Sequence, residues 1–584
     1  MKTKTPNSNE SIDKIKAELR QLEQQPLEGS EQSKALAKAY VELSDEYWKI
    51  GTSTTLPQAV AAGEQAIHYA EELPLEVDEY RDVLASAYIG VGNAQWKLGT
   101  PTDLQQALAS YNQAIQLIKA LPLDNHEYRN NLAIAYRKYG NAQSDLGTPS
   151  DLQQAIESYN QAIKLSQELP LDNPEYRNDL AMAYMNRGSA QWKLGTPSDL
   201  QQAIESYNQA IKLSQELPLD NPEYRNDLAA AYMNRGNAQD HLGTPSDLQQ
   251  AIESYNQAIK LRQDLPLDNP EYRNSLAMAY MNRGNAQKNL GTPSDLQQAI
   301  ESYNQAIKLR QELPLDNPEY RNSLASAYVN RGSAQLKLGT PSDLQQAIES
   351  YNQAIKLRQE LSLDNPEYRN ELAKAYNNRG SAQDHLGTPS DLQQAIESYN
   401  QAITITESLN KHVLGYVEAR ASAFGNKAIA CLQHGDFEEA NEAAEEGLEL
   451  LRDLEISGVY VLRSYREWLF DITINTYLAM GPHFLTEFLL EHLEPNNKGA
   501  APQSEAMHNA ALHALQRLYL MAARGHPEWL LDIQQTLTQL ARIRARYFIG
   551  TATGAQLMAQ YHEENANDIK RAEQTLTDYT KQCH

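Results

Sequence analysis

Histidine and acidic side chains that could hold a metal ion come closest together near the carboxyl end of the chain. His483, Glu487, Glu491 and His492 fall within one predicted helix, residues 482–493. Zinc and similar ions need ligands at characteristic spacings, and none of the standard spacings occurs in this cluster. The pattern therefore favours a solvated helix face, and we expect no bound metal.

Other residues that could carry catalysis lack the companions that the chemistry needs. The glycines of residues 550–554 have neither the lysine nor the preceding strand of a phosphate-binding loop. The pairs Asp240–His241 and Asp384–His385 are sequence neighbours, which point in different directions on a helix and so make poor proton-transfer dyads. We expect neither enzymatic activity nor a cofactor.

The composition is that of a folded, acidic protein. The chain has 584 residues, of which 41% are hydrophobic and 22% charged, and its formal net charge is −25. A nucleic-acid-binding protein needs a basic stripe to displace counterions from phosphates, so nucleic acid is not expected as a partner. The charge is compatible with basic or neutral partners and with simple solubility.

The two cysteines and the apolar segments bear on location. Cys431 lies in an apolar stretch, which predicts a core thiol. Cys431 and Cys583 are the two cysteines of the chain, and two are too few for a disulfide framework. Residues 1–14 have no apolar core of a signal peptide, and no stretch approaches the roughly 18 apolar residues that span a bilayer. We expect a cytoplasmic protein with no membrane partner.

A fixed repeat organises most of the chain. A Gly-Thr dipeptide recurs every 48 residues, and a further glycine keeps the period without its threonine. The dipeptides begin at Gly51, Gly99, Gly147, Gly195, Gly243, Gly291, Gly339 and Gly387, and the last glycine is Gly435. Such a period is typical of stacked supersecondary units.

Residues 173–217 show how one unit folds. Asn173 and Pro174 are typical of a helix start, because Asn accepts a bond from a free backbone N–H and Pro has none to satisfy. Gly195 ends this first helix, and Thr196 begins a second. Both helices carry apolar residues at three- and four-residue spacing. We therefore predict an all-α protein built of antiparallel helix pairs.

Small and aromatic positions of the unit resemble the tetratricopeptide repeat. They are Gly188, Ala190, Gly195, Ala203, Tyr207 and Ala210. The resemblance implies a right-handed superhelical solenoid, in which small residues let the helices approach and Tyr207 fills the gap between neighbouring units. The family unit has 34 residues, so these helices are longer, similar to variants in bacterial signalling proteins and in kinesin-light-chain-like arrays. Arg187 and Gln191 depart from the family, which usually has Leu and an aromatic residue there.

The repeats divide the chain into three predicted parts. Residues 1–29 form a tail with a capping helix at 11–25, and residues 30–455 form a solenoid of nine repeats. The repeat vanishes in residues 456–584, which still have helical patterns. We predict there a separate helical domain that caps the array, assembles, or acts as an effector.

Differences between the copied units gather on one side of the first helix of each pair. Counted back from the glycine that ends this helix, they occur at positions 13, 10, 3 and 2. We call the residues at these four positions the first-helix face. The second helix, in contrast, repeats Leu-Gln-Gln-Ala-Ile-Glu-Ser-Tyr-Asn-Gln-Ala-Ile unchanged in six successive units. Drift would also have altered its exposed Gln and Glu, so the pattern predicts that the first-helix face binds a partner.

Thirteen residues of this face are the predicted partner-binding set. They are Trp96, Arg137, Met182, Met185, Trp192, Met233, His241, Met281, Lys288, Val329, Leu336, Asn377 and Asp384. Tryptophan and methionine would give an adaptable apolar lining in the amino-terminal and central units, and later units turn polar. The alternative, that some of these side chains pack between repeats, stays open at this point.

The function that these patterns favour is that of a non-enzymatic scaffold or adaptor. Its partner would be a protein or peptide in the concave groove that the family lines with the first helices. The resemblance to bacterial arrays implies a regulatory role in signalling or defence as one setting. In the main alternative, the repeats are a sensor for a catalytic or self-assembling effector in residues 456–584. The partner's identity and the oligomeric state do not follow from the sequence.

Overall fold

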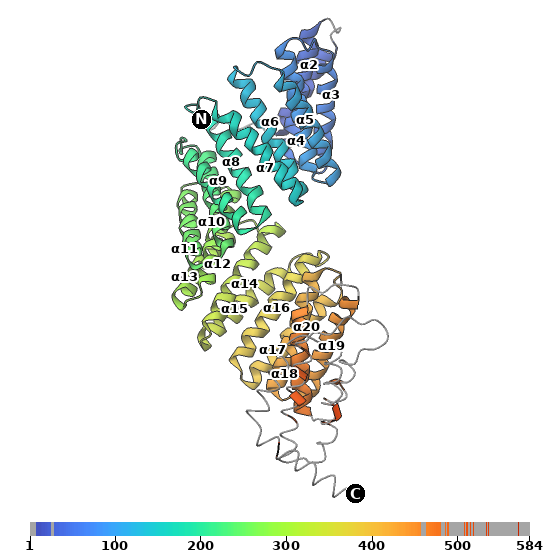
Figure 1. Ribbon diagram of the computed structural model, residues 1–584, viewed down its shortest axis with the longest axis vertical. Helices are drawn as coiled ribbons and strands as arrows, with labels where there is room; N and C mark the ends of the chain where they lie inside the picture. The colour runs from blue at the N-terminus through green and yellow to red at the C-terminus, as the bar shows by residue number, and fades with distance from the viewer. Residues whose placement is uncertain are drawn as a thin grey trace. The chain divides into compact units, whose positions relative to one another are not determined.

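A computed structural model describes residues 8–24, 29–410, 412–456 and 463–480, with separate positions from Leu485 onward. These residues form twenty helices and no strand, which confirms the predicted all-α fold of paired helices. The chain divides into two compact units, residues 1–309 and 310–584, which we describe separately. Figure 1 shows each unit as consecutive helices running back and forth beside one another.

The first unit begins with α1 (Ser8–Glu23), close to the predicted capping helix, and continues in helix pairs. Its first helices are α2 (Ser30–Ile50), α4 (Asp78–Leu98), α6 (His126–Leu146), α8 (Pro174–Leu194), α10 (Pro222–Leu242) and α12 (Pro270–Leu290). The second helices are α3 (Thr55–Glu71), α5 (Pro101–Lys119), α7 (Pro149–Gln167), α9 (Pro197–Gln215), α11 (Pro245–Gln263) and α13 (Pro293–Gln311), whose last residues belong to the second unit.

The second unit continues the same alternation. Its first helices are α14 (Pro318–Leu338), α16 (Pro366–Leu386) and α18 (Leu414–His434), and its second helices are α15 (Pro341–Gln359), α17 (Pro389–Glu407) and α19 (Phe437–Ile456). One further helix, α20 (Arg463–Met480), packs on α18 and α19. The helices predicted after Met480 lie outside the described residues. The predicted domain boundaries at 29/30 and 455/456 stay predictions.

The predicted helix ends are formed by the expected bonds. At the start of α8, Asn173 Oδ1 accepts from the Glu175 N–H at 2.9 Å. Gly195 ends α8 with φ +81°, a conformation that other residues rarely adopt. At the start of α9, Thr196 Oγ1 accepts from the Asp199 N–H at 3.2 Å, and Asp199 Oδ2 accepts from the Thr196 N–H at 3.3 Å. Each repeat therefore specifies where its helices begin and end.

Close approach of the paired helices depends on a glycine opposite a tyrosine. A Cβ atom on Gly188 of α8 would lie only 2.7 Å from Cε1 of Tyr207 on α9. Tyr207 is buried, and it also joins one apolar cluster with Ala238 of the following first helix. The tyrosine thus packs against its own pair and against the next one, as the resemblance implies.

The two departures from the family pattern form a polar network in place of apolar contacts. Arg187 Nε donates to Ser206 Oγ at 3.0 Å, and Arg187 Nη1 donates to Asn160 Oδ1 on the preceding second helix, also at 3.0 Å. Ser206 Oγ donates in turn to Gln191 Oε1 at 2.7 Å. Arg187 therefore joins its pair to the preceding second helix, and Gln191 joins the two helices of its own pair.

Candidate partner-binding face

The first helices of each unit share one surface. In the first unit, neighbouring first helices contact one another from α2 through α4, α6, α8 and α10 to α12, and in the second unit α16 contacts both α14 and α18. A side chain on a first helix therefore faces solvent, its own second helix, or the neighbouring first helix. These three environments decide which predicted residues are accessible to a partner.

Position 13 of the first-helix face is exposed in some units and half-buried in others. Met182 is half-buried there, and its counterpart in α12, Met278, is 46% exposed. Lys374, the counterpart in α16, is also exposed and pairs with Glu371 at 3.0 Å. A partner that lies on the first helices would therefore meet side chains at this position.

Position 10 faces the neighbouring first helix. Arg137 Nη2 of α6 forms an ion pair with Asp179 Oδ1 of α8 at 3.1 Å. Asn377 Oδ1 of α16 accepts from Asn426 Nδ2 of α18, also at 3.1 Å. Both residues are half-buried, as are Met185 and Val329 at the same position. Position 10 therefore serves mainly the packing between neighbouring first helices.

Two predicted binding residues at position 10 need correction. Met233 is 5% exposed and Met281 is 6% exposed, so both side chains are already buried by the chain itself. The expectation that they offer apolar surface to a partner is wrong. The reason is that residues at position 10 lie toward the next first helix, a neighbour that the pattern of one helix does not reveal.

Positions 3 and 2 lie at the carboxyl ends of the first helices, where they bridge neighbours while staying accessible. Trp96 Nε1 of α4 donates to Asp145 Oδ2 of α6 at 2.8 Å. Trp192 is 40% exposed, and its ring meets that of the exposed His241 edge-on, with centroids 6.2 Å apart. Lys288, Leu336 and Asp384 are half-buried at position 3. An aromatic pair on two helices is a surface that a partner could contact.

A pocket opens on the same side of the first helices at the amino-terminal end of the array. Its volume is about 410 Å³. The lining residues are Lys38, Val41 and Glu42 of α2, Glu79, Asp82, Val83 and Ser86 of α4, and Glu127 and Tyr128 of α6. Lys38 and Ser86 occupy position 13 of their units, and Val41 occupies position 10. The pocket therefore belongs to the first-helix face.

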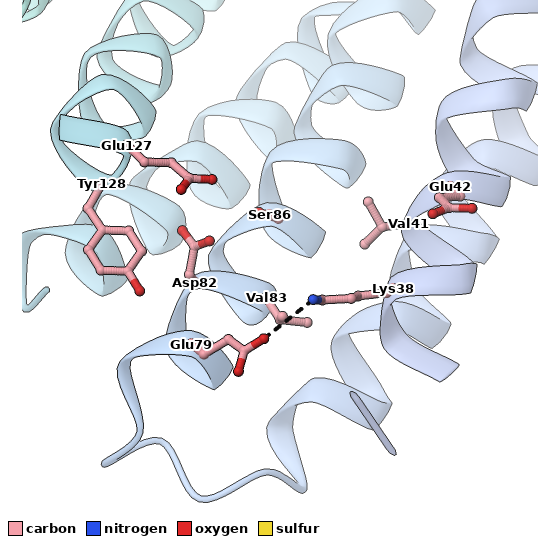
Figure 2. A pocket seen from close by; sticks show the side chains of 9 residues that line it. All are labelled: Lys38, Val41, Glu42, Glu79, Asp82, Val83, Ser86, Glu127 and Tyr128. Atoms are coloured by element: carbon pink, nitrogen blue, oxygen red, sulfur yellow. Dashed lines mark ion pairs between the residues drawn. The ribbon is translucent and has the colours of Figure 1, made fainter. Parts of the chain in front are cut away.

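Carboxylates dominate the charge of this pocket. It is lined by four of them and by one lysine. Figure 2 shows Lys38 reaching toward Glu79, which it meets at 3.5 Å, and Lys34 also pairs with Glu79 at 2.7 Å. Glu79 is therefore neutralised, whereas Asp82, Glu42 and Glu127 form no ion pair among the described residues. A positively charged group is the electrostatic complement of this pocket.

The environment of Asp82 offers little compensation for the negative charge of its carboxylate. Burial raises the pKa of the Asp82 carboxyl, and Glu127 adds to the shift. The amide of Asn131 donates to Asp82 Oδ1 at 3.2 Å and opposes it. The pKa of Tyr128 is also raised, by burial first and then by Asp82. Negative charge thus converges on one half-buried wall of the pocket.

Sequence reasoning missed this pocket because the first unit, which supplies one of its walls, is a degenerate copy. The first-helix face was found by comparing units that are nearly identical, and α2 differs from those at most positions. One signal was present: Glu79, Asp82 and Glu127 all lie in the first two turns of predicted first helices. Their convergence on a single pocket requires the packing of three helices.

The repeated units match a known family. A sequence profile described as tetratricopeptide repeat matches residues 181–217, 229–265, 277–313 and 325–361. Each match covers most of a first helix and the whole of the following second helix. These four segments of the chain are tetratricopeptide repeats.

Solved tetratricopeptide-like structures resemble the chain at low identity. The apo form of RapI is 12% identical over 72% of this chain and 98% of that chain, with a TM-score of 0.44. The apo form of the quorum sensor NprR from B. thuringiensis is 13% identical over 70% and 97%, with a TM-score of 0.39. A putative kinesin light chain from Podospora anserina is 20% identical over 41% and 97%, with a TM-score of 0.27. No match was found among curated protein sequences.

The structure also bears on the sequence predictions for the cysteine, for metal binding and for membrane spans. Cys431 is fully buried, and burial raises the pKa of its thiol to about 12, which confirms a core thiol. In the described part of the chain, no group of three His, Cys, Asp or Glu side chains could hold a metal, and no helix is long and apolar enough to cross a bilayer. His483 and His492 lie outside the described residues.

Proposed function

We propose that this tetratricopeptide protein is a cytoplasmic, non-enzymatic scaffold that binds a protein or peptide partner on its first-helix face. Within that face, the pocket between α2, α4 and α6 receives a basic side chain of the partner. The observation that carries the proposal is that this pocket opens at the repeat positions that vary among the later units. This coincidence supports a single surface for the partner and the pocket.

The accessible side chains support a peptide-like partner. Trp192 and Met278 are large apolar groups with 40% and 46% of their surface exposed. Burying each would contribute roughly 1–2 kcal/mol, since neither starts fully exposed. Aromatic anchors of this kind concentrate binding energy at interfaces. An apolar stretch in the centre of the face and an acidic pocket at its amino-terminal end together fit a partner with both apolar and basic residues.

An array of immobilised decapeptides tests the pocket. One set carries an Arg-Lys pair at its centre, and matched sets carry Gln-Gln or Glu-Glu instead. We expect the full chain to prefer the basic set. The double variant Glu42→Gln/Glu127→Gln should weaken that binding about tenfold, which corresponds to about 1.4 kcal/mol, because it removes two of the unpaired carboxylates.

A second double variant controls for the overall negative charge. Glu157 and Glu205 are exposed on the second helices α7 and α9, and Glu157→Gln/Glu205→Gln changes the net charge by the same amount. This variant should bind the basic peptides as the unchanged chain does. Equal weakening in both variants would mean that the peptides respond to net charge alone, and the pocket assignment would be wrong.

A further inference from the structure

Three second helices carry a buried arginine at the same repeat position. They are Arg262 in α11, Arg310 in α13 and Arg358 in α15, with 7%, 5% and 1% of their surface exposed. Earlier second helices have Ser166 and Ser214 there. A guanidinium stays charged in almost all protein environments, and burying it without a counter-charge costs several kcal/mol. The three arginines differ in how this cost is met.

Arg358 is compensated by a carboxylate of the chain. Its Nη2 forms an ion pair with Glu371 Oε2 at 3.0 Å, and its Nη1 donates to the Glu371 carbonyl at 2.8 Å. On the other side, Nε donates to Asn322 Oδ1 at 3.3 Å, and Nη2 also donates to Ser326 Oγ at 3.2 Å. The arginine thus inserts between the first helices α14 and α16 and ends against the carboxylate.

Arg262 and Arg310 lack that carboxylate. Serine replaces glutamate at the equivalent positions, which are Ser275 and Ser323. The Nη1 atoms still donate to the carbonyls of these serines at 2.7 Å in both cases, so each guanidinium group lies beside the start of the first helix that follows it. Neither Nε has a hydrogen-bond partner, and neither arginine forms an ion pair with any residue that the structure describes.

The missing carboxylate changes what acts on the pKa of each guanidinium group. Burial alone lowers the pKa of Arg262 and of Arg310 to about 10. For Arg358 the pKa is also lowered by burial, but Glu371 opposes the shift. The first two guanidinium groups therefore stand in the chain as buried cations without an anion.

The position that Glu371 fills opens toward the first-helix face. Its side chain is 36% exposed, although the arginine that it covers is 1% exposed, so the carboxylate lies on the solvent side of the guanidinium. Ser275, its counterpart beside Arg262, precedes the exposed Met278 by three residues on α12, which is one helical turn. The place left by the shorter serine is therefore reached from the surface proposed to bind the partner.

We infer that Arg262 and Arg310 are each a binding site for a carboxylate of the partner, an aspartate or glutamate side chain that takes the place Glu371 fills beside Arg358. The step from a carboxylate to a partner rests on the proposed function. The recognition of a carboxylate does not, because it follows from the contrast among the three arginines. Ionised hydrogen bonds of this kind are short and strong.

Acetate is the probe that tests recognition without any partner. The full chain is labelled with ¹⁵N-arginine, and the Nε–Hε resonances of the three arginines are followed during titration with sodium acetate against sodium chloride at equal ionic strength. We expect saturable shifts for Arg262 and Arg310 and none for Arg358. Equal responses from Arg262 and Arg358, or no response from any of the three, would overturn the inference.

Two substitutions exchange the environments. Ser275→Glu should abolish the acetate response of Arg262 and leave that of Arg310, because the chain then supplies the carboxylate itself. Glu371→Ser should give Arg358 a response that it lacks in the unchanged chain. If either exchange leaves the pattern as it was, the responses do not come from these sites.

Thermal unfolding provides a second readout that separates charge from size. Ser275→Glu should melt at a higher temperature than Ser275→Gln, because both side chains fill the space and only glutamate compensates Arg262. A melting temperature of Ser275→Glu equal to or below that of Ser275→Gln would contradict the inference. Neither measurement involves a partner. Failure of the peptide array would therefore refute the proposed function, whereas the acetate titration and the thermal unfolding test carboxylate recognition independently.

Discussion

At the scale of single residues, the helix pairs are held together by buried polar groups that form hydrogen bonds and by closely packed apolar groups. In the pair α8 and α9, Ser206 is fully buried and yet both accepts a bond from Arg187 and donates one to Gln191. A buried polar group costs about 1–3 kcal/mol when its partner is lost. The network therefore specifies the register of the two helices, because a shift by one turn would break every bond in it.

Replacing Gly188 by alanine should destabilise the protein. The new Cβ would lie 2.7 Å from Tyr207 Cε1, so the ring must shift, and this ring is buried. Overpacking of this kind costs roughly 1–3 kcal/mol, of which the better helix propensity of alanine returns at most about 1 kcal/mol. Urea unfolding followed by circular dichroism should show a lower midpoint.

Gly415→Ala is the matched control for this substitution. Gly415 lies in the first turn of α18, and a Cβ there would meet nothing within 4 Å. The control should be neutral or stabilising by up to about 1 kcal/mol. Similar losses in the two variants would show that the glycines matter through backbone freedom and not through contact with tyrosine.

The buried tyrosines should resist ionisation until the repeats unfold. Burial raises the pKa of Tyr207 and Tyr351 to about 12, from an ordinary value of 10. Because the folded pKa lies above the unfolded one, the stability that these groups contribute is complete below pH 10 and is lost as pH rises through about 12. Phenolate absorbance from these tyrosines should therefore appear together with the loss of helical circular dichroism. Complete ionisation with helicity intact would contradict this reading of the core.

At the scale of helices, the first and second helices of a pair differ in which neighbours they contact. A second helix packs on its own first helix and on the first helix of the next pair, and its sequence is almost invariant in the repeats. A first helix contacts, in addition, the first helices on both sides. It therefore combines packing positions with accessible ones, and variation alone does not separate the two.

This difference explains what the sequence could and could not predict. The caps at Asn173 and Thr196, the turn at Gly195 and the glycine–tyrosine contact are local or repeated, so the pattern is sufficient for them. The burial of Met233 and Met281 was not predictable, because it depends on a neighbouring first helix 48 residues away. The pocket lined by Asp82 and its neighbours needed three helices in place, and the contacts of Arg358 needed the three helices α14, α15 and α16 in register.

Removal of one whole unit should preserve the fold. Deletion of residues 195–242 takes away α9 and α10 and brings Leu194 before Gly243, which restores the same repeat. Because each pair contacts mainly its neighbours, the shorter chain should keep its helical content per residue. Circular dichroism measures this content directly.

Removal of half a unit should not be tolerated in the same way. Deletion of residues 195–218 takes away α9 alone and leaves α8 without the second helix of its own pair. Helical content per residue and the thermal midpoint should both fall relative to the whole-unit deletion. Equal behaviour of the two deletions would contradict the 48-residue pair as the folding unit.

At the scale of the whole molecule, each of the two units repeats an accessible surface along its first helices. The formal net charge of −25 is spread over the chain, while the proposed recognition elements are local: an acidic pocket at α2, α4 and α6, exposed apolar side chains at Trp192 and Met278, and buried arginines behind the face. A partner that meets several of these at once gains affinity from each. The central claim is that such a partner lies on the first helices.

Site-specific photo-crosslinking in cells of the source organism tests that claim most directly. A photoreactive phenylalanine derivative is placed at Trp192 or Met278 on the first-helix face, and at Gln201 or Glu205, which are exposed on the second helix α9. We predict that both first-helix positions crosslink to the same polypeptide and that the second-helix positions do not. Crosslinking from Gln201 or Glu205 alone, or from none of the four positions, would contradict the account.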